Sequence, residues 1–135
     1  MIISVETKVN AKLEQVWNVW TKPEHIVNWN FASPEWHCPK AENSLKVGET
    51  FTYEMAAKDG SFSFPFSGKY TKIELYRRIE YVLDDNRKVT IQFEEKDKQT
   101  LVTESFEAEG TNADEMQRAG WQAILENFKI YTEMR

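Results

Sequence analysis

Apolar and polar residues alternate along the first nine positions of the chain. Ile3, Val5, Thr7 and Val9 form one side of this pattern, with polar residues between them. An alternation of period two places every second side chain on the same face of an extended strand. The pattern therefore predicts a strand over Ile2–Val9 with one buried face.

The apolar spacing then changes to that of a helix. Apolar side chains recur at Leu13, Val16, Trp17 and Trp20. We expect a helix over residues 11–20 that is capped by Asn10, and a second, short helix that runs to about Trp29. Thr21 is the expected cap of this second helix, and Pro23 lies in its first turn, where proline is tolerated.

Strands dominate the middle of the chain. Residues 30–46 have little periodicity and carry Pro34 and Pro39, so only a short strand near residues 36–38 is expected there. The alternation then returns and predicts strands over residues 49–57, 62–75, 78–83, 88–95 and 100–107. Asp59-Gly60 is the strongest turn signal between them, because glycine tolerates a positive φ.

Two residues interrupt the pattern of the predicted strand over residues 62–75. Pro65 has no N–H to donate to a neighbouring strand, which predicts a bulge or an edge position at that point. Gly68 indicates a crowded site, either where the sheet bends or where a helix approaches it closely.

The chain ends with one long amphipathic helix over residues 112–135. Asn112 and Glu115 have the spacing of a capping box. Small and apolar residues form a stripe at Met116, Gly120, Trp121, Ile124, Leu125, Phe128 and Tyr131. This helix is the only element long enough to cover one face of the strands. The expected fold is α+β, a single domain over residues 1–135 in which a curved antiparallel sheet of about six to seven strands surrounds the terminal helix.

Composition and charge exclude several classes of protein. The chain is 41% hydrophobic and 29% charged, as expected of a globular domain. A net charge of −5 argues against nucleic-acid binding, and no apolar stretch is long enough for membrane insertion. The chain has one cysteine, Cys38, and no leader-like pattern at its start, so we expect a cytoplasmic location.

Catalytic and metal-binding patterns are weak. His37 and Cys38 are adjacent, but neighbouring side chains of an extended segment point to opposite faces, so they do not form a catalytic pair. Two histidines and one cysteine do not have the spacing of zinc ligands, and no glycine-rich phosphate loop is present. We therefore expect no cofactor, no metal and no catalytic residue, and the case for an enzyme is weak.

Aromatic residues make up 13% of the chain, and they leave two interpretations open. The rings either fill the core or line a cavity for an apolar ligand. In the second interpretation Tyr53, Tyr70 and His37 orient the ligand. The expected mouth is the irregular segment that contains Trp29, Phe31, Trp36 and His37. The predicted ligand-binding residues are Trp29, Trp36, His37, Phe51, Tyr53, Met55, Phe64, Phe66, Tyr70, Trp121, Ile124, Leu125 and Phe128.

Several strings along the chain resemble those of one family. They are VWNVWTKPEHIVNW (residues 16–29), VGETF (47–51), DG (59–60), FSGKYTKI (66–73) and GWQAILENF (120–128). With the order of the elements, they resemble the START/Bet v 1-like (SRPBCC) superfamily and, within it, the family related to the C-terminal domain of the activator of Hsp90 ATPase. The resemblance spans essentially the whole chain.

The resemblance implies a helix-grip fold with an internal cavity that often holds apolar or amphipathic small molecules. The wider superfamily includes lipid carriers, hormone receptors, polyketide cyclases and co-chaperone modules. Three hypotheses follow: a small-molecule binding protein, a co-chaperone-type module with a chaperone partner, and a cyclase- or hydrolase-like enzyme. The first is the principal prediction, for a monomer or a homodimer.

Overall fold

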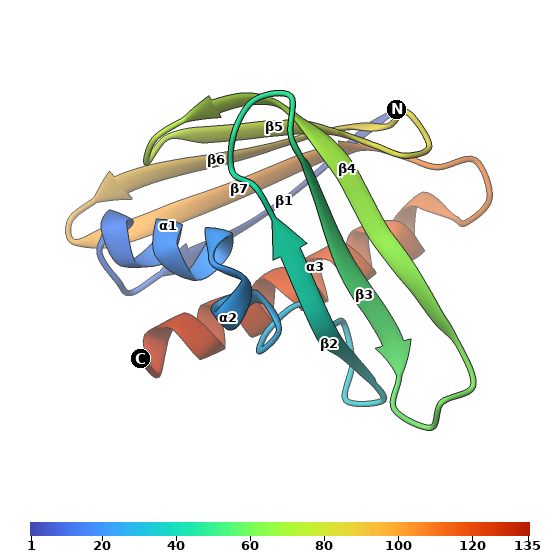
Figure 1. The fold of residues 1–135 in the computed structure, drawn as a ribbon. Helices are drawn as coiled ribbons and strands as arrows, with labels where there is room; N and C mark the ends of the chain where they lie inside the picture. The colour runs from blue at the N-terminus through green and yellow to red at the C-terminus, as the bar shows by residue number, and fades with distance from the viewer.

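A computed structural model describes residues 1–135. Seven strands and three helices follow one another along the chain (Figure 1). They are β1 (Ile2–Val9), α1 (Leu13–Thr21), α2 (Pro23–Ile26), β2 (Trp36–Asn43), β3 (Thr50–Ala57), β4 (Ser63–Glu74), β5 (Arg78–Leu83), β6 (Lys88–Lys96), β7 (Gln99–Glu107) and α3 (Asp114–Glu133).

All seven strands form one antiparallel sheet in the order β1-β7-β6-β5-β4-β3-β2. The two short helices carry the chain from β1 at one edge of the sheet to β2 at the other. Figure 1 shows the sheet curling into a half-barrel, with α3 lying across its concave side. The predicted α+β helix-grip fold is confirmed.

The core lies between the concave face of the sheet and α3. Strand residues alternate as predicted, since β1 and β7 each bury every second side chain. Leu125 and Phe128 of α3 are fully buried, and Val16 and Trp17 of α1 complete the core at one end. Burial of apolar side chains from the sheet, α1 and α3 therefore holds α3 on the sheet.

The predicted caps of the two short helices are wrong. α1 begins at Leu13, because the Ala11 N–H donates to the Val9 carbonyl and forms a tight turn before the helix. The Thr21 hydroxyl donates to the Trp17 carbonyl at 2.8 Å within α1 and does not cap α2. The second helix is a single turn over Pro23–Ile26, and it ends before Trp29.

The predicted capping box of α3 is also wrong. The helix begins after Ala113, and no side chain caps it. The Asn112 amide instead donates to the Glu109 carboxylate. Gln117 joins the loop to the helix, because its amide accepts from the Glu109 N–H at 2.9 Å and donates to the Asn112 carbonyl at 2.8 Å.

The prolines and one glycine determine the shape of the outer strands. β2 is longer than expected, and its register against β3 shifts between His37 and Lys40, around Pro39. Pro65 pairs with β3 alone, since the pairing of β4 with β5 begins only at Gly68, so the predicted edge position is confirmed. A side chain at Gly68 would lie 2.7 Å from the Val82 carbonyl oxygen and 3.0 Å from the Phe51 ring, so the predicted crowding is confirmed.

Candidate functional site

A cavity of about 330 Å³ lies between the sheet and the N-terminal half of α3. Twelve of its 20 lining residues are hydrophobic, so its wall is mainly apolar. Strands β3, β4, β5 and β7 supply one wall, and α3 supplies the other. The volume is at the lower end of the range found for small-molecule sites.

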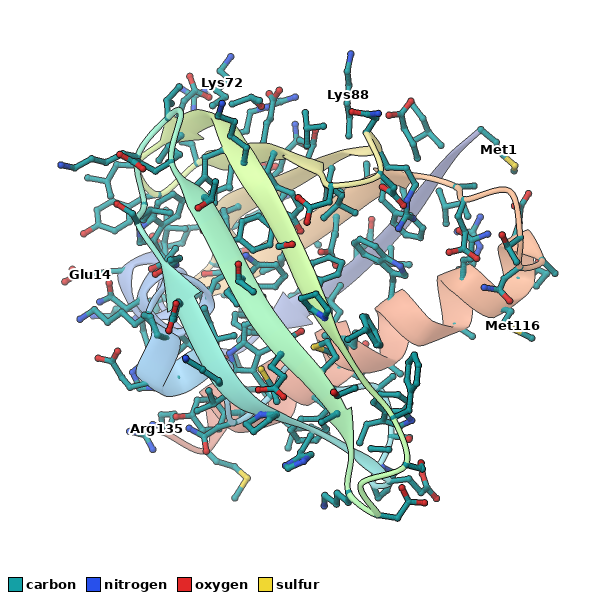
Figure 2. The ribbon with its side chains drawn as sticks, turned by 45° about the vertical axis from the view of Figure 1, so that its right-hand side comes forward. Met1, Glu14, Lys72, Lys88, Met116 and Arg135 are labelled. Atoms are coloured by element: carbon teal, nitrogen blue, oxygen red, sulfur yellow. The ribbon has the colours of Figure 1, made fainter.

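Aromatic rings fix the width of the cavity. The Trp121 indole stacks on Phe106 at a centroid separation of 3.9 Å, and it meets the Phe66 ring edge-on at 6.1 Å. At the end of the cavity nearest α1, the ring centroids of Trp20 and Trp29 are 5.0 Å apart. Met116 also contributes to the wall and is largely exposed; Figure 2 shows it near the start of α3, at the opposite end of that helix from Arg135.

Eight of the 13 predicted ligand-binding residues line this cavity. They are Trp29, Tyr53, Met55, Phe64, Phe66, Tyr70, Trp121 and Ile124. The structure brings them together from the α2–β2 loop, β3, β4 and α3. Their role in binding a ligand stays a prediction.

The other five predicted residues lie elsewhere. Phe51, Leu125 and Phe128 are buried in the solid core, because neighbouring rings or the sheet cover them on every side. Trp36 is the first residue of β2 and packs against Phe62 and Phe64. His37 follows it on the same edge strand and does not line the cavity. Trp36 and His37 were expected at the mouth, and neither is among the residues that line the cavity.

Sequence reasoning missed twelve residues of the lining: Trp20, Thr21, Asn30, Ile79, Tyr81, Arg87, Glu104, Glu109, Asn112, Met116, Gln117 and Gly120. For Glu104 a signal was available. The buried positions of β7 are Thr100, Val102, Glu104 and Phe106, so the alternation places a carboxyl group on the inward face. An ionisable residue at an inward strand position is the exception that indicates a functional candidate.

The Glu104 carboxyl is the most perturbed acid of the cavity. The residue is 6% exposed, and burial raises its pKa to about 8. Its side chain makes no hydrogen bond and no ion pair within the protein. Every fully buried side-chain nitrogen or oxygen of this protein has a hydrogen-bond partner. The Glu104 oxygens have no such partner, so they are not fully buried and contact the open space of the cavity.

Tyr81 and Arg87 extend this polar region. Burial and then the charge of Glu104 raise the pKa of Tyr81 well above its ordinary value, while Arg87 acts in the opposite direction. The Tyr81 hydroxyl makes no hydrogen bond within the protein. The Arg87 guanidinium is held in place, since it donates to Asp85 at 2.8 Å and to the Glu107 carbonyl at 3.3 Å.

Other reactive groups do not gather at the cavity. Cys38 is buried at the register shift of β2, and burial is the main cause that raises the pKa of its thiol. No group of three His, Cys, Asp or Glu side chains is arranged to hold a metal ion. None of the helices combines the length and the apolar character needed to cross a membrane.

Comparison with known proteins identifies the family. Residues 10–133 match the family described as Activator of Hsp90 ATPase homolog 1-like protein. The chain belongs to this family. No curated protein has a sequence that matches it significantly.

Solved structures of similar proteins have the same fold. The AHSA1-like protein from Aeromonas hydrophila is 43% identical, with a TM-score of 0.94 over 99% of this chain and 93% of that one. A protein from Cytophaga hutchinsonii is 52% identical, with a TM-score of 0.85 over 98% and 92%. A protein from Nitrosomonas europaea is similar in fold alone, at 17% identity and a TM-score of 0.86 over 99% and 95% of the two chains.

Proposed function

We propose that this protein binds an apolar or amphipathic small molecule in the cavity between the sheet and α3, without covalent chemistry. One observation carries the proposal: a space of about 330 Å³ with a mainly hydrophobic lining persists beside α3. An apolar ligand would gain roughly 25 cal/mol for each Å² of surface removed from water. We extend the proposal to a cytoplasmic protein, because its single cysteine forms no disulfide.

Substitutions on α3 test this proposal with ethylnaphthalene as an apolar probe. Trp121→Ala removes the ring that stacks on Phe106, and we expect it to weaken probe binding about tenfold or more, or roughly 1.4 kcal/mol. Gly120→Leu places a side chain where no atom lies within 4 Å of the added Cβ, and we expect it to fill the cavity and exclude the probe.

The matched control is Ile130→Ala, on the exposed side of the same helix. Titration followed by heteronuclear NMR gives the affinity and shows whether each variant is folded. Unchanged affinity in folded Trp121→Ala and Gly120→Leu variants would contradict the proposal. Native mass spectrometry of the purified wild-type protein would reveal a small molecule that is retained from the cell.

A co-chaperone role is the second candidate, and the family description favours it. Phe62 and Phe64 lie at the exposed end of the β3–β4 hairpin, beside Trp36, and could contact a partner protein. Under this alternative, the protein would stimulate the ATPase of an Hsp90 chaperone, and Phe62→Ser would abolish the stimulation while leaving probe binding intact. Our proposal predicts no stimulation. The enzyme alternative would need Glu104 to act on a bound substrate.

A further inference from the structure

Glu104 lines the cavity from β7. Its strand, β7, lies between β1 and β6, and Glu104 pairs with Val5 on one side and Ile91 on the other. Both of these neighbours are buried and apolar. No protein group compensates the carboxyl, although leaving a buried polar group without a partner is costly.

Tyr81 supplies a second unpartnered oxygen to the same space. Tyr81 is 8% exposed and Glu104 6%, and both residues line the cavity. Each fully buried polar side-chain atom has a hydrogen-bond partner, whereas the Tyr81 hydroxyl and the Glu104 carboxyl have none. These oxygens therefore face the space of the cavity. The sheet register brings the two residues to the same region of the inward face, because Tyr81 pairs with Val89 and Val89 pairs with Phe106, two residues along β7 from Glu104.

We propose that Glu104 and Tyr81 form a polar subsite that donates hydrogen bonds to an oxygen atom of a neutral, ring-bearing ligand, such as an aromatic ketone. This inference rests on the proposed function, since it names the chemical class of the ligand. The apolar rings of the cavity would hold the body of the molecule, and the subsite would orient its carbonyl group.

The protonation state of Glu104 makes it a donor. With a pKa of about 8, the carboxyl is mostly neutral at neutral pH and carries one O–H. A neutral carboxyl and a phenol in an apolar site can both donate to the same ligand oxygen, an arrangement that ketosteroid isomerase uses. The other titratable or charged groups of the cavity wall are Tyr53 on β3, Tyr70 on β4, Arg87 on the β5–β6 turn and Glu109 on the loop before α3.

The surroundings favour a neutral ligand over a cation. A cationic amine would require Glu104 to ionise in an apolar wall, and it would lie near the positive charge of Arg87. A carbonyl oxygen needs no change of charge. It also satisfies both unpartnered groups, which lowers the cost of their burial.

Three naphthalene probes of similar shape test the subsite: acetylnaphthalene, ethylnaphthalene and naphthylethylamine. We expect the ketone to bind roughly 3- to 10-fold more tightly than the hydrocarbon at neutral pH, as one or two net hydrogen bonds would give. Its affinity should fall by up to about tenfold from about pH 7 to about pH 9, as the free carboxyl ionises through a pKa of about 8.

Variants of Glu104 separate the subsite from general packing. Glu104→Gln keeps a donor that does not titrate, so ketone affinity should lose its pH dependence. Glu104→Leu should reduce ketone affinity toward that of ethylnaphthalene, since the Tyr81 hydroxyl is then the one donor left, without weakening ethylnaphthalene binding. Glu94→Gln, on the exposed side of β6, is the matched control and should behave as the wild type.

Each other outcome overturns a defined part of the proposal. If ethylnaphthalene binds but the ketone binds no more tightly, the subsite is wrong and the proposed function stands. Tighter binding of the amine, increasing with pH, would show that ionised Glu104 is the recognition group and would overturn the subsite. If no probe binds to the folded protein, both the subsite and the proposed function fail.

Discussion

Glu104 is the one acidic residue on the buried face of β7, which otherwise carries apolar side chains and a threonine. The buried face of β7 continues through Val102 and Phe106, so the carboxyl has the environment of a core residue. A buried carboxyl resists ionisation because the charged form loses its hydration. Its main effect on the folded protein should therefore appear in the dependence of stability on pH.

We expect the Glu104 carboxyl to reduce the stability of the wild-type protein as pH rises from its ordinary pKa of 4.5 to about 8. Over this interval the folded state holds a proton that the unfolded state has released, so the free energy of unfolding falls as pH rises. This contribution to stability is complete below pH 4.5 and is lost as pH rises to about 8. The free energy of unfolding should therefore fall by about 3 kcal/mol between pH 5 and pH 8.

Urea unfolding at both ends of that interval measures the effect. Glu104→Gln should lack this component of the pH dependence, while Glu94→Gln on the exposed side of β6 should retain it. Identical pH profiles for wild type and Glu104→Gln would show that the carboxyl ionises as easily in the folded protein as in the unfolded chain.

At the scale of elements, the two halves of α3 differ in how they pack. Its C-terminal half packs tightly, since Phe128 contacts the rings of Trp20 and Trp29 at centroid distances of 4.9 Å. Its N-terminal half, with Gly120 and Trp121, borders the cavity. One half of the helix therefore anchors it, and the other half leaves space.

Two substitutions near the end of α3 should differ strongly in their cost. Phe128→Ala removes a fully buried ring and should reduce the free energy of unfolding by about 3–5 kcal/mol. Ile130→Ala, at a position that is 56% exposed, should change it by about 0.5 kcal/mol or less. Chemical denaturation measures both, and similar costs for the two variants would mean that the helix does not pack through this face.

At the scale of the whole molecule, the curvature of the sheet creates the cavity. Seven strands curl around one helix (Figure 1), and a cavity of about 330 Å³ remains between them. The space that remains is lined by residues from strands, loops and α3 that lie far apart in the sequence. A ligand of this cavity binds the folded protein alone, because unfolding separates the residues that line it.

A probe that occupies the cavity should therefore raise the thermal stability of the protein. At a free concentration of about 100 times its Kd, acetylnaphthalene should add about 2.7 kcal/mol to the free energy of unfolding, because the unfolded chain has no cavity to bind it. Differential scanning calorimetry should show a Tm increase of roughly 5 °C or more. The Gly120→Leu variant should show no increase, and a wild-type Tm that does not change with probe concentration would exclude binding to the folded state.

Local patterns determined the elements of this protein and its fold. The alternation in Ile2–Val9 and the stripe on the last helix each reflect a periodicity that one segment carries by itself, so β1 and α3 could be predicted to within a few residues. Pro65 and Gly68 were interpretable for the same reason, since their constraints act on the local backbone.

Only the tertiary structure decided which inward-facing residues line a cavity and which fill the core. Phe51 and Tyr53 lie on the same face of β3, yet Tyr53 reaches the cavity and Phe51 is enclosed by other rings. The predicted helix caps failed for a local reason, because the side chains of Asn112 and Thr21 donate to Glu109 and Trp17, which precede them by three and four residues. Parity in a strand fixes the face of a side chain, whereas the depth at which it lies depends on sheet curvature and on the position of α3, which arise from contacts between segments distant in sequence.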